Sequence, residues 1–260
     1  MDKKYLTRRK TPEEYELEEK QVEFTRLERE LVKKELELVT LQAELHTFQN
    51  RYLRIVGIKY SELDEINAQI AERLAKLRPK DEKAQEHARH ARDQAEDSAH
   101  IAEEIKKTKP AKDFESNERL KSLYRKLAML IHPDTTTDSK EKERRHRLMV
   151  EINRAYEEGD EECLQKILDE WESSPDSVQG EGTAAELVRT IRKISQVKKR
   201  LSGIEKEIAK LRQSELYQLK LKVEEAKSSG RDLLVEMVAQ IEKQISEARK
   251  QLNGLSKEEK

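Results

Sequence analysis

Apolar residues recur every seven positions along the first part of the chain. One series is Leu17, Phe24, Leu31, Leu38, Leu45 and Tyr52. The second is Leu27, Leu41, Phe48 and Ile55, with Lys20 and Lys34 as polar interruptions. Two series at heptad spacing predict a long helix that buries one seam in a coiled coil. The helix is expected to begin at Thr11-Pro12, because Thr caps helices and Pro is favoured at their first position, and to end at Pro79.

The heptad register shifts by four residues after Tyr52. The stripe then continues through Val56, Leu63, Ile70 and Leu77. Such a shift is a stutter, which unwinds the supercoil locally without ending the helix. Gly57 lies at this point, where we expect a bend.

A second long helical region is predicted from about residue 184 to residue 252. Its seams are Leu187, Ile194, Leu201 and Ile208, and Val197, Ile204 and Leu211, followed by an apolar stripe to Leu252. Ser228-Ser229-Gly230 predicts a break, and Asn253-Gly254 predicts the end. Between the two regions, residues 81–109 carry a stripe of alanines, which suits either close packing on another helix or a solvated connector.

The composition agrees with long helices. Charged residues make up 41% of the 260 residues and aromatic residues 4%, with only seven glycines and five prolines. Lys and Arg (53) nearly balance Asp and Glu (54), so bulk charge indicates neither nucleic acid nor membrane as a partner. One cysteine, Cys163, excludes an intrachain disulfide. No apolar run approaches the length of a membrane span, and we expect a cytoplasmic protein.

Residues 113–171 have the only globular pattern. Residues 116–131 place apolar side chains at spacings of three and four, which predicts one buried helix face. The helix should stop at His132-Pro133, because Pro disfavours helical geometry in the residue before it. A polar loop follows, and Asp138 or Ser139 is expected to cap the next helix, with a short last helix after Gly159-Asp160.

Two stretches of this segment resemble the J-domain family. Residues 123–134, Leu-Tyr-Arg-Lys-Leu-Ala-Met-Leu-Ile-His-Pro-Asp, resemble its second helix and signature loop, and residues 151–157, Glu-Ile-Asn-Arg-Ala-Tyr-Glu, resemble its third helix. The resemblance covers about sixty residues, less than a quarter of the chain. The family's first helix is not recognisable, and either residues 81–109 or a shorter element near Phe114 is expected to replace it. Met149 stands where the family usually has Phe, and Gly159 where it has Leu.

The resemblance implies a co-chaperone that recruits a DnaK-type heat-shock chaperone and stimulates its ATPase. His132, Pro133 and Asp134 would then present a rigid loop to that partner, while Lys121, Arg125 and Lys126 would form a basic face that guides the encounter. The chain itself would be no enzyme and would need no cofactor. The client protein is not evident from the sequence.

Two other interpretations remain. The chain could be a structural coiled-coil scaffold or adaptor whose helical insert only resembles a J-domain. His87 and His90 have the spacing of metal ligands on a helix, but a polar surface helix often shows this spacing, and we predict no metal site.

We therefore expect an all-α protein in which coiled-coil arms flank an inserted module. The expected parts are an N-terminal arm (1–79), a connecting helix (80–112), a J-domain-like module (113–171), a linker (172–183) and a C-terminal arm (184–260). The arms have similar predicted lengths of about 95 and 100 Å at 1.5 Å per residue. They are expected to pair as an antiparallel hairpin with the module near its tip and both termini together. A homodimer, in which each arm pairs with its copy, is the alternative.

Overall fold

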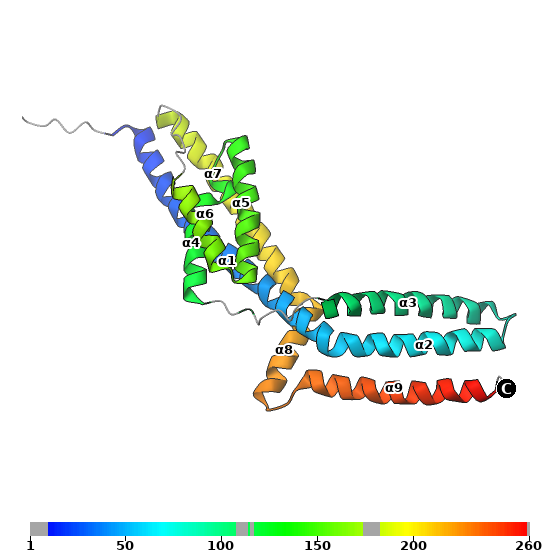
Figure 1. The fold of residues 1–260 in the computed structure, drawn as a ribbon. Coiled ribbons are helices and arrows are strands. Elements are labelled where there is room, and N and C mark those ends of the chain that lie inside the picture. Colours follow the sequence, from blue (N-terminus) through cyan, green and yellow to red (C-terminus); the bar gives the residue numbers. More distant parts are fainter. Residues whose placement is uncertain (1–9, 108–113, 115–116, 174–182, 259–260) are drawn as a thin grey trace, which may run out of the picture. The chain divides into compact units, whose positions relative to one another are not determined.

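The computed structural model describes residues 10–107, 114, 117–173 and 183–258, and the regular structure of these residues is entirely helical (Figure 1). The predicted all-α fold class is confirmed. The predicted linker, residues 172–183, lies almost wholly outside the described residues. No helix in the described ranges is both long and apolar enough to cross a bilayer.

The predicted N-terminal arm is one continuous helix of 66 residues. It consists of α1 (Pro12–Tyr52), a π-helical turn (Leu53–Gly57) and α2 (Ile58–Leu77). The π turn lies where the heptad register shifts, so the local change in helix winding predicted after Tyr52 is a π-helical turn. A Cβ atom on Gly57 would lie 3.2 Å from Leu53 Cδ2, which explains why the smallest residue is accommodated best there.

The chain forms two compact units. The first contains Met1–Ala43 and Phe114–Gln213, and the second contains Glu44–Asp113 and Ser214–Lys260. Each unit takes part of the long helix and part of the C-terminal arm. We describe each unit by itself.

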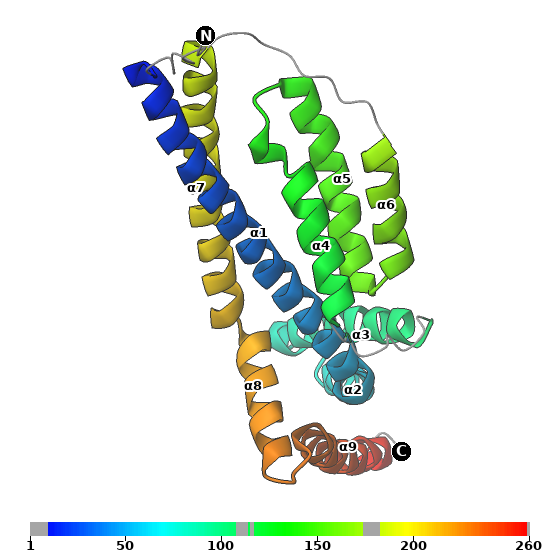
Figure 2. The ribbon, with the colours of Figure 1, turned by 90° about the vertical axis from the view of Figure 1, so that its left-hand side faces the viewer.

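In the first unit, α7 (Thr183–Gln213) lies alongside α1. Gln21 Nε2 donates to Glu186 Oε1 at 3.1 Å, and Arg212 pairs with Glu37 at 3.0 Å. From the first pair to the second, the residue numbers increase along both helices, so the two helices run parallel (Figure 2). The prediction that the two arms pair as an antiparallel hairpin is therefore wrong. Heptad seams specify which face of a helix is buried, and they leave the direction of its partner open.

In the second unit, α2 does have an antiparallel partner, which is α3 (Glu82–Lys107). Gln85 Nε2 donates to the Ala75 carbonyl at 2.9 Å, and Ser98 Oγ donates to Asp64 at 2.6 Å. Every third or fourth residue of α3 facing α2 is small, and three are buried: Ala88, Ala95 and Ala102. The alanine stripe thus serves close packing on another helix, not a solvated connector.

The rest of the C-terminal arm completes the second unit. Helix α8 (Glu215–Ser228) ends at the predicted break, where Gly230 has a φ of 74°. Helix α9 (Leu233–Glu258) runs parallel to α2, since Lys59 pairs with Glu242 and Arg73 binds the Leu252 carbonyl. Helix α9 continues through Asn253-Gly254, so the predicted end there is wrong. Gly254 has open space around it, and Gly is tolerated inside a helix at a modest cost.

Candidate partner-binding site

The predicted amphipathic helix of the module is α4 (Glu118–Ile131). Asn117 caps it, because its Oδ1 accepts a hydrogen bond from the Leu120 N–H at 2.7 Å. Its buried face is the predicted one: Leu120, Tyr124, Leu127, Ala128 and Ile131. The helix ends at Ile131, immediately before His132-Pro133, so Pro133 terminates it as expected.

Helices α5 (Ser139–Glu158) and α6 (Glu161–Ser173) complete the module. Asp138 caps α5 by accepting from the Glu141 N–H at 2.8 Å, and Gly159 ends it with a φ of 70°. The rings of Tyr124 and Tyr156 meet edge to face with their centroids 4.9 Å apart. Helices α4 and α5 lie side by side and are joined by the His-Pro-Asp loop (Figure 2).

The long helix α1 takes part in the module's core. Val32, Leu36 and Val39 pack with the buried residues of α4, α5 and α6. Phe114 also packs there, with its ring centroid 5.5 Å from that of Tyr156. Helix α3 lies in the second unit and does not pack on the core of the module, so the suggestion that residues 81–109 fill the place of the family's first helix there is wrong. The helix that packs on this core is α1, which the sequence had suggested only as a coiled-coil arm.

The loop after α4 is held by its own hydrogen bonds. Residues Pro133–Thr135 form one 3₁₀ turn. The Asp134 N–H donates to His132 Nδ1 at 3.1 Å, and the Thr135 hydroxyl donates to the His132 carbonyl at 2.7 Å. The Asp134 carboxylate pairs with Lys142 at 3.0 Å. The three residues of the predicted motif therefore have a defined geometry.

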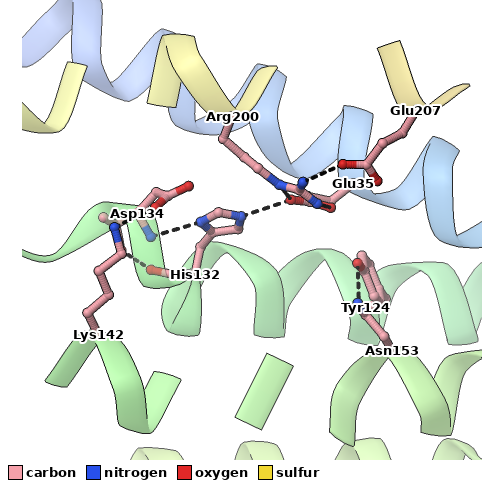
Figure 3. Close-up of polar contacts among 9 residues, drawn as sticks. Glu35, Tyr124, His132, Asp134, Lys142, Asn153, Arg200 and Glu207 are labelled. Carbon is pink, nitrogen blue, oxygen red and sulfur yellow. Dashed lines mark hydrogen bonds and ion pairs between the residues drawn. The ribbon is translucent and has the colours of Figure 1, made fainter. Parts of the chain in front are cut away.

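His132 is buried against the neighbouring long helices. Only 3% of the residue is exposed, and its Nε2 lies 3.1 Å from Glu35 Oε1 on α1. Arg200 on α7 binds the same carboxylate with two hydrogen bonds, of 2.7 and 3.0 Å (Figure 3). Because Nδ1 accepts from a main-chain N–H, the ring proton lies on Nε2 and is donated to Glu35. We call this group of three residues the His132–Glu35–Arg200 cluster.

Glu35 is the charged centre of this cluster. Burial alone would raise the pKa of its carboxyl, but hydrogen bonds from His132 and Arg200 outweigh burial and hold the pKa below its ordinary value. Burial likewise opposes the charge of Arg200, and the bonds to Glu35 outweigh it and raise the guanidinium pKa. Arg200 also pairs with Glu207 at 3.0 Å. The carboxylate is thus ionised although it is only 5% exposed.

The predicted basic face has intramolecular partners too. Lys121 is half-buried, whereas Arg125 and Lys126 are exposed. Lys121 and Arg125 both approach Glu118, at 3.6 and 3.3 Å. Lys126 pairs with Glu172 at 2.7 Å. Ion pairs this exposed contribute little and exchange readily with other partners.

A groove of about 530 Å³ adjoins the loop. Its walls include the loop residues His132, Pro133 and Asp134, and its other lining comes from α5, Glu35 and Arg200. Val150 on this wall is 59% exposed, which is unusual for a large apolar side chain in a packed module. The groove reaches both Asp134 and His132, although only 3% of His132 is exposed in this conformation.

Other candidate chemistry finds no support in the geometry. Among the described residues, no group of three or more His, Cys, Asp or Glu side chains could hold a metal ion. His87 and His90 are exposed on α3. Burial raises the pKa of the Cys163 thiol, which makes it a poorer nucleophile.

The sequence pattern indicated the loop and the basic face as a candidate site but gave no indication of Glu35 or Arg200. Both look like ordinary charged residues of a coiled coil. One signal was present: Val32, Leu36 and Val39 lie outside both heptad series at helical spacing, which indicates a second buried face on α1 beside Glu35. Searches of protein-family models, curated proteins and solved structures found no match to this chain.

Proposed function

We propose that this protein is a J-domain co-chaperone that recruits a DnaK-type chaperone and stimulates its ATPase. The observation that carries the proposal is the braced His132-Pro133-Asp134 turn at the end of the amphipathic helix α4, beside α5 in a small helical core. The family resemblance of residues 123–134 and 151–157 falls on these same elements. In this proposal the protein does no chemistry and works in the cytoplasm with its chaperone.

The charges of the module fit such an encounter. Arg125 and Lys126 are exposed on α4, and their acidic partners Glu118 and Glu172 are exposed as well. An acidic chaperone surface would compete with these weak pairs and orient the module. Binding would favour the chaperone state that hydrolyses ATP, which is a linkage effect between two sites.

A structural scaffold with a J-like insert is the second candidate function. The burial of His132 favours it, because a side chain that is 3% exposed cannot contact a partner in this conformation. In that case the cluster with Glu35 and Arg200 serves only to join the module to α1 and α7. Clients, or a second copy of the chain, would then be the relevant partners.

Single-turnover ATP hydrolysis separates the two candidates. The host's purified DnaK-type chaperones are each loaded with ATP and mixed with wild-type protein, His132→Gln or Asp134→Asn. The proposal expects stimulation by the wild type that both variants lose, with His100→Gln, an exposed histidine of α3, as the matched control. Circular dichroism and the fluorescence of Trp171, the single tryptophan, verify that each variant is folded. Unchanged stimulation by His132→Gln and Asp134→Asn would remove the site assignment.

A further inference from the structure

The loop is closed by the stalk, by which we mean α1 and α7 within the first unit. Helix α7 packs against the Pro133–Thr135 turn. Glu35 holds the His132 ring from α1, and Arg200 holds Glu35 from α7 (Figure 3). The residue expected to meet the chaperone is therefore almost fully buried, with 3% of its surface exposed.

We infer that the His132–Glu35–Arg200 cluster is an autoinhibitory latch, which keeps the module inactive until the loop leaves the stalk. This inference rests on the proposed co-chaperone function. It explains both observations that otherwise point in opposite directions: a loop built like a J-domain signature and a buried histidine within it. Only molecules with an open loop bind the chaperone, so the apparent affinity equals the intrinsic affinity multiplied by the fraction of molecules that are open.

Burial separates the latch from the other ion pairs of the module. The pairs of Lys126 with Glu172 and of Arg125 with Glu118 are exposed, so water and salt screen them and a partner can displace them. The Glu35 carboxylate and the His132 ring are both shielded from water. Loss of a hydrogen bond to such a charged group shifts an equilibrium by roughly ten- to a hundredfold.

Opening must be local. Val32 and Val39 belong to the same hydrophobic core as Tyr124 and Tyr156, so removing the whole module from α1 would expose that core. The loop, in contrast, can turn outward while the core remains packed. It lies at the end of α4 and opens onto the solvent-accessible groove beside α5.

The remaining contacts of the cluster keep the free-energy cost of such an opening low. When His132 leaves, Glu35 retains two hydrogen bonds from Arg200, so no buried charge is left unpaired. The His132 ring exchanges its contact with Glu35 for hydrogen bonds to solvent. Opening therefore breaks the contact that holds the loop and preserves the one that joins α1 to α7.

Glu35→Ala tests the latch directly. The readout is the concentration of variant that gives half-maximal stimulation of single-turnover ATP hydrolysis by the host's DnaK-type chaperone. We expect about a tenfold lower concentration for Glu35→Ala than for the wild type, since one charge-assisted hydrogen bond holds the loop closed. Glu37→Ala is the matched control, because Glu37 also pairs with α7, through Arg212, but has no contact with His132.

Two further variants make the test decisive. Glu35→Gln keeps the size of the side chain and weakens the charge-assisted bond, so a smaller gain of about threefold is expected even if Glu35→Ala fails to fold. The double variant Glu35→Ala/His132→Gln should lose stimulation. Nitrogen NMR of the histidine side chains gives a second readout, in which the His132 Nε2–H signal of the closed state disappears in Glu35→Ala.

Each outcome distinguishes the latch from the co-chaperone proposal. Equal half-maximal concentrations for wild type and Glu35→Ala, with loss in the double variant, would overturn the latch and leave the co-chaperone function standing. Weaker stimulation by a folded Glu35→Ala would make the cluster a positioning contact, which also overturns the latch. No stimulation by any of the proteins, the released variants included, would overturn the co-chaperone function itself.

Discussion

The hydroxyl oxygens of Tyr156 and Thr40 lie 3.0 Å apart, although 116 positions separate the two residues in the sequence. Tyr156 belongs to α5 of the module and Thr40 to α1. The contact continues the apolar packing of Val32 and Val39 against the module. The module and α1 therefore form one folding unit and not a domain attached to a separate arm.

Shortening Val39 should destabilise the module even though Val39 lies on the long helix. Val39 is 2% exposed, so Val39→Ala removes two buried methyl groups and should lower the free energy of unfolding by about 2 kcal/mol. Val22, on the same helix, is 68% exposed, and Val22→Ala should change the free energy of unfolding by less than about 0.5 kcal/mol. Urea unfolding followed by Trp171 fluorescence measures both. Equal effects would show that α1 is not part of the module's core.

Acid should weaken the first unit through Glu35. Its pKa is held below the ordinary value by His132 and Arg200 against the opposing effect of burial. A lowered folded-state pKa contributes stability that is complete above the unfolded pKa, about 4.3 for Glu, and is lost as the pH falls through the folded value. The contribution of Glu35 to the free energy of unfolding should therefore be constant near neutrality and decline below about pH 4.3.

The measurement compares the wild type with Glu35→Gln across the acid range. The variant should be less stable at pH 7, and the gap between the two proteins should narrow as the pH falls. Glu19→Gln, an exposed glutamate on the same helix, is the control and should follow the wild type. Curves for wild type and Glu35→Gln that stay parallel to low pH would contradict this linkage.

Charge reversal on α4 should weaken chaperone coupling and leave the fold intact. Arg125→Glu/Lys126→Glu changes exposed side chains, so the stability should shift by less than about 1 kcal/mol. The association rate should fall by about tenfold, and added salt should have a smaller effect on the variant than on the wild type. Arg154→Glu reverses an exposed charge on α5 and is the control. Stopped-flow binding to the chaperone gives the association rates. Wild-type rates for the α4 variant would show that Arg125 and Lys126 do not guide the encounter.

Spin labels should confirm the parallel arrangement of α1 and α7 within one chain. Cysteines replace Gln21 and Glu186, whose side chains are hydrogen-bonded, and Cys163→Ser removes the native thiol. Double electron–electron resonance should give a short distance that persists when labelled protein is diluted with unlabelled protein. Loss of the short distance on dilution would indicate pairing between copies. Labels far apart within each chain would exclude the parallel pairing altogether.

The sequence predicted most of what depends on local spacing. The start of the long helix at Pro12, its irregularity after Tyr52 and the end of α4 before Pro133 all follow from residues close in the chain. The direction of the helix pairs could not be predicted, because apolar seams are compatible with either direction. The burial of His132 depends on Glu35 and Arg200, which are distant in sequence and carry no local sign of their partnership.

The π-helical turn Leu53–Gly57 also constrains how this chain can change length. A π turn closes with i→i+5 hydrogen bonds and holds about one residue more than an α turn, so a deletion there restores regular α-helix. Each residue deleted from the first turns of α2 itself would instead rotate the rest of that helix by about 100°. Ile66 and Ile70, now buried against α8 and α9, would then point elsewhere. The π turn is therefore the place in this helix where the loss of one residue disturbs the buried face of α2 least, whereas Gly57 leaves little room for a larger side chain.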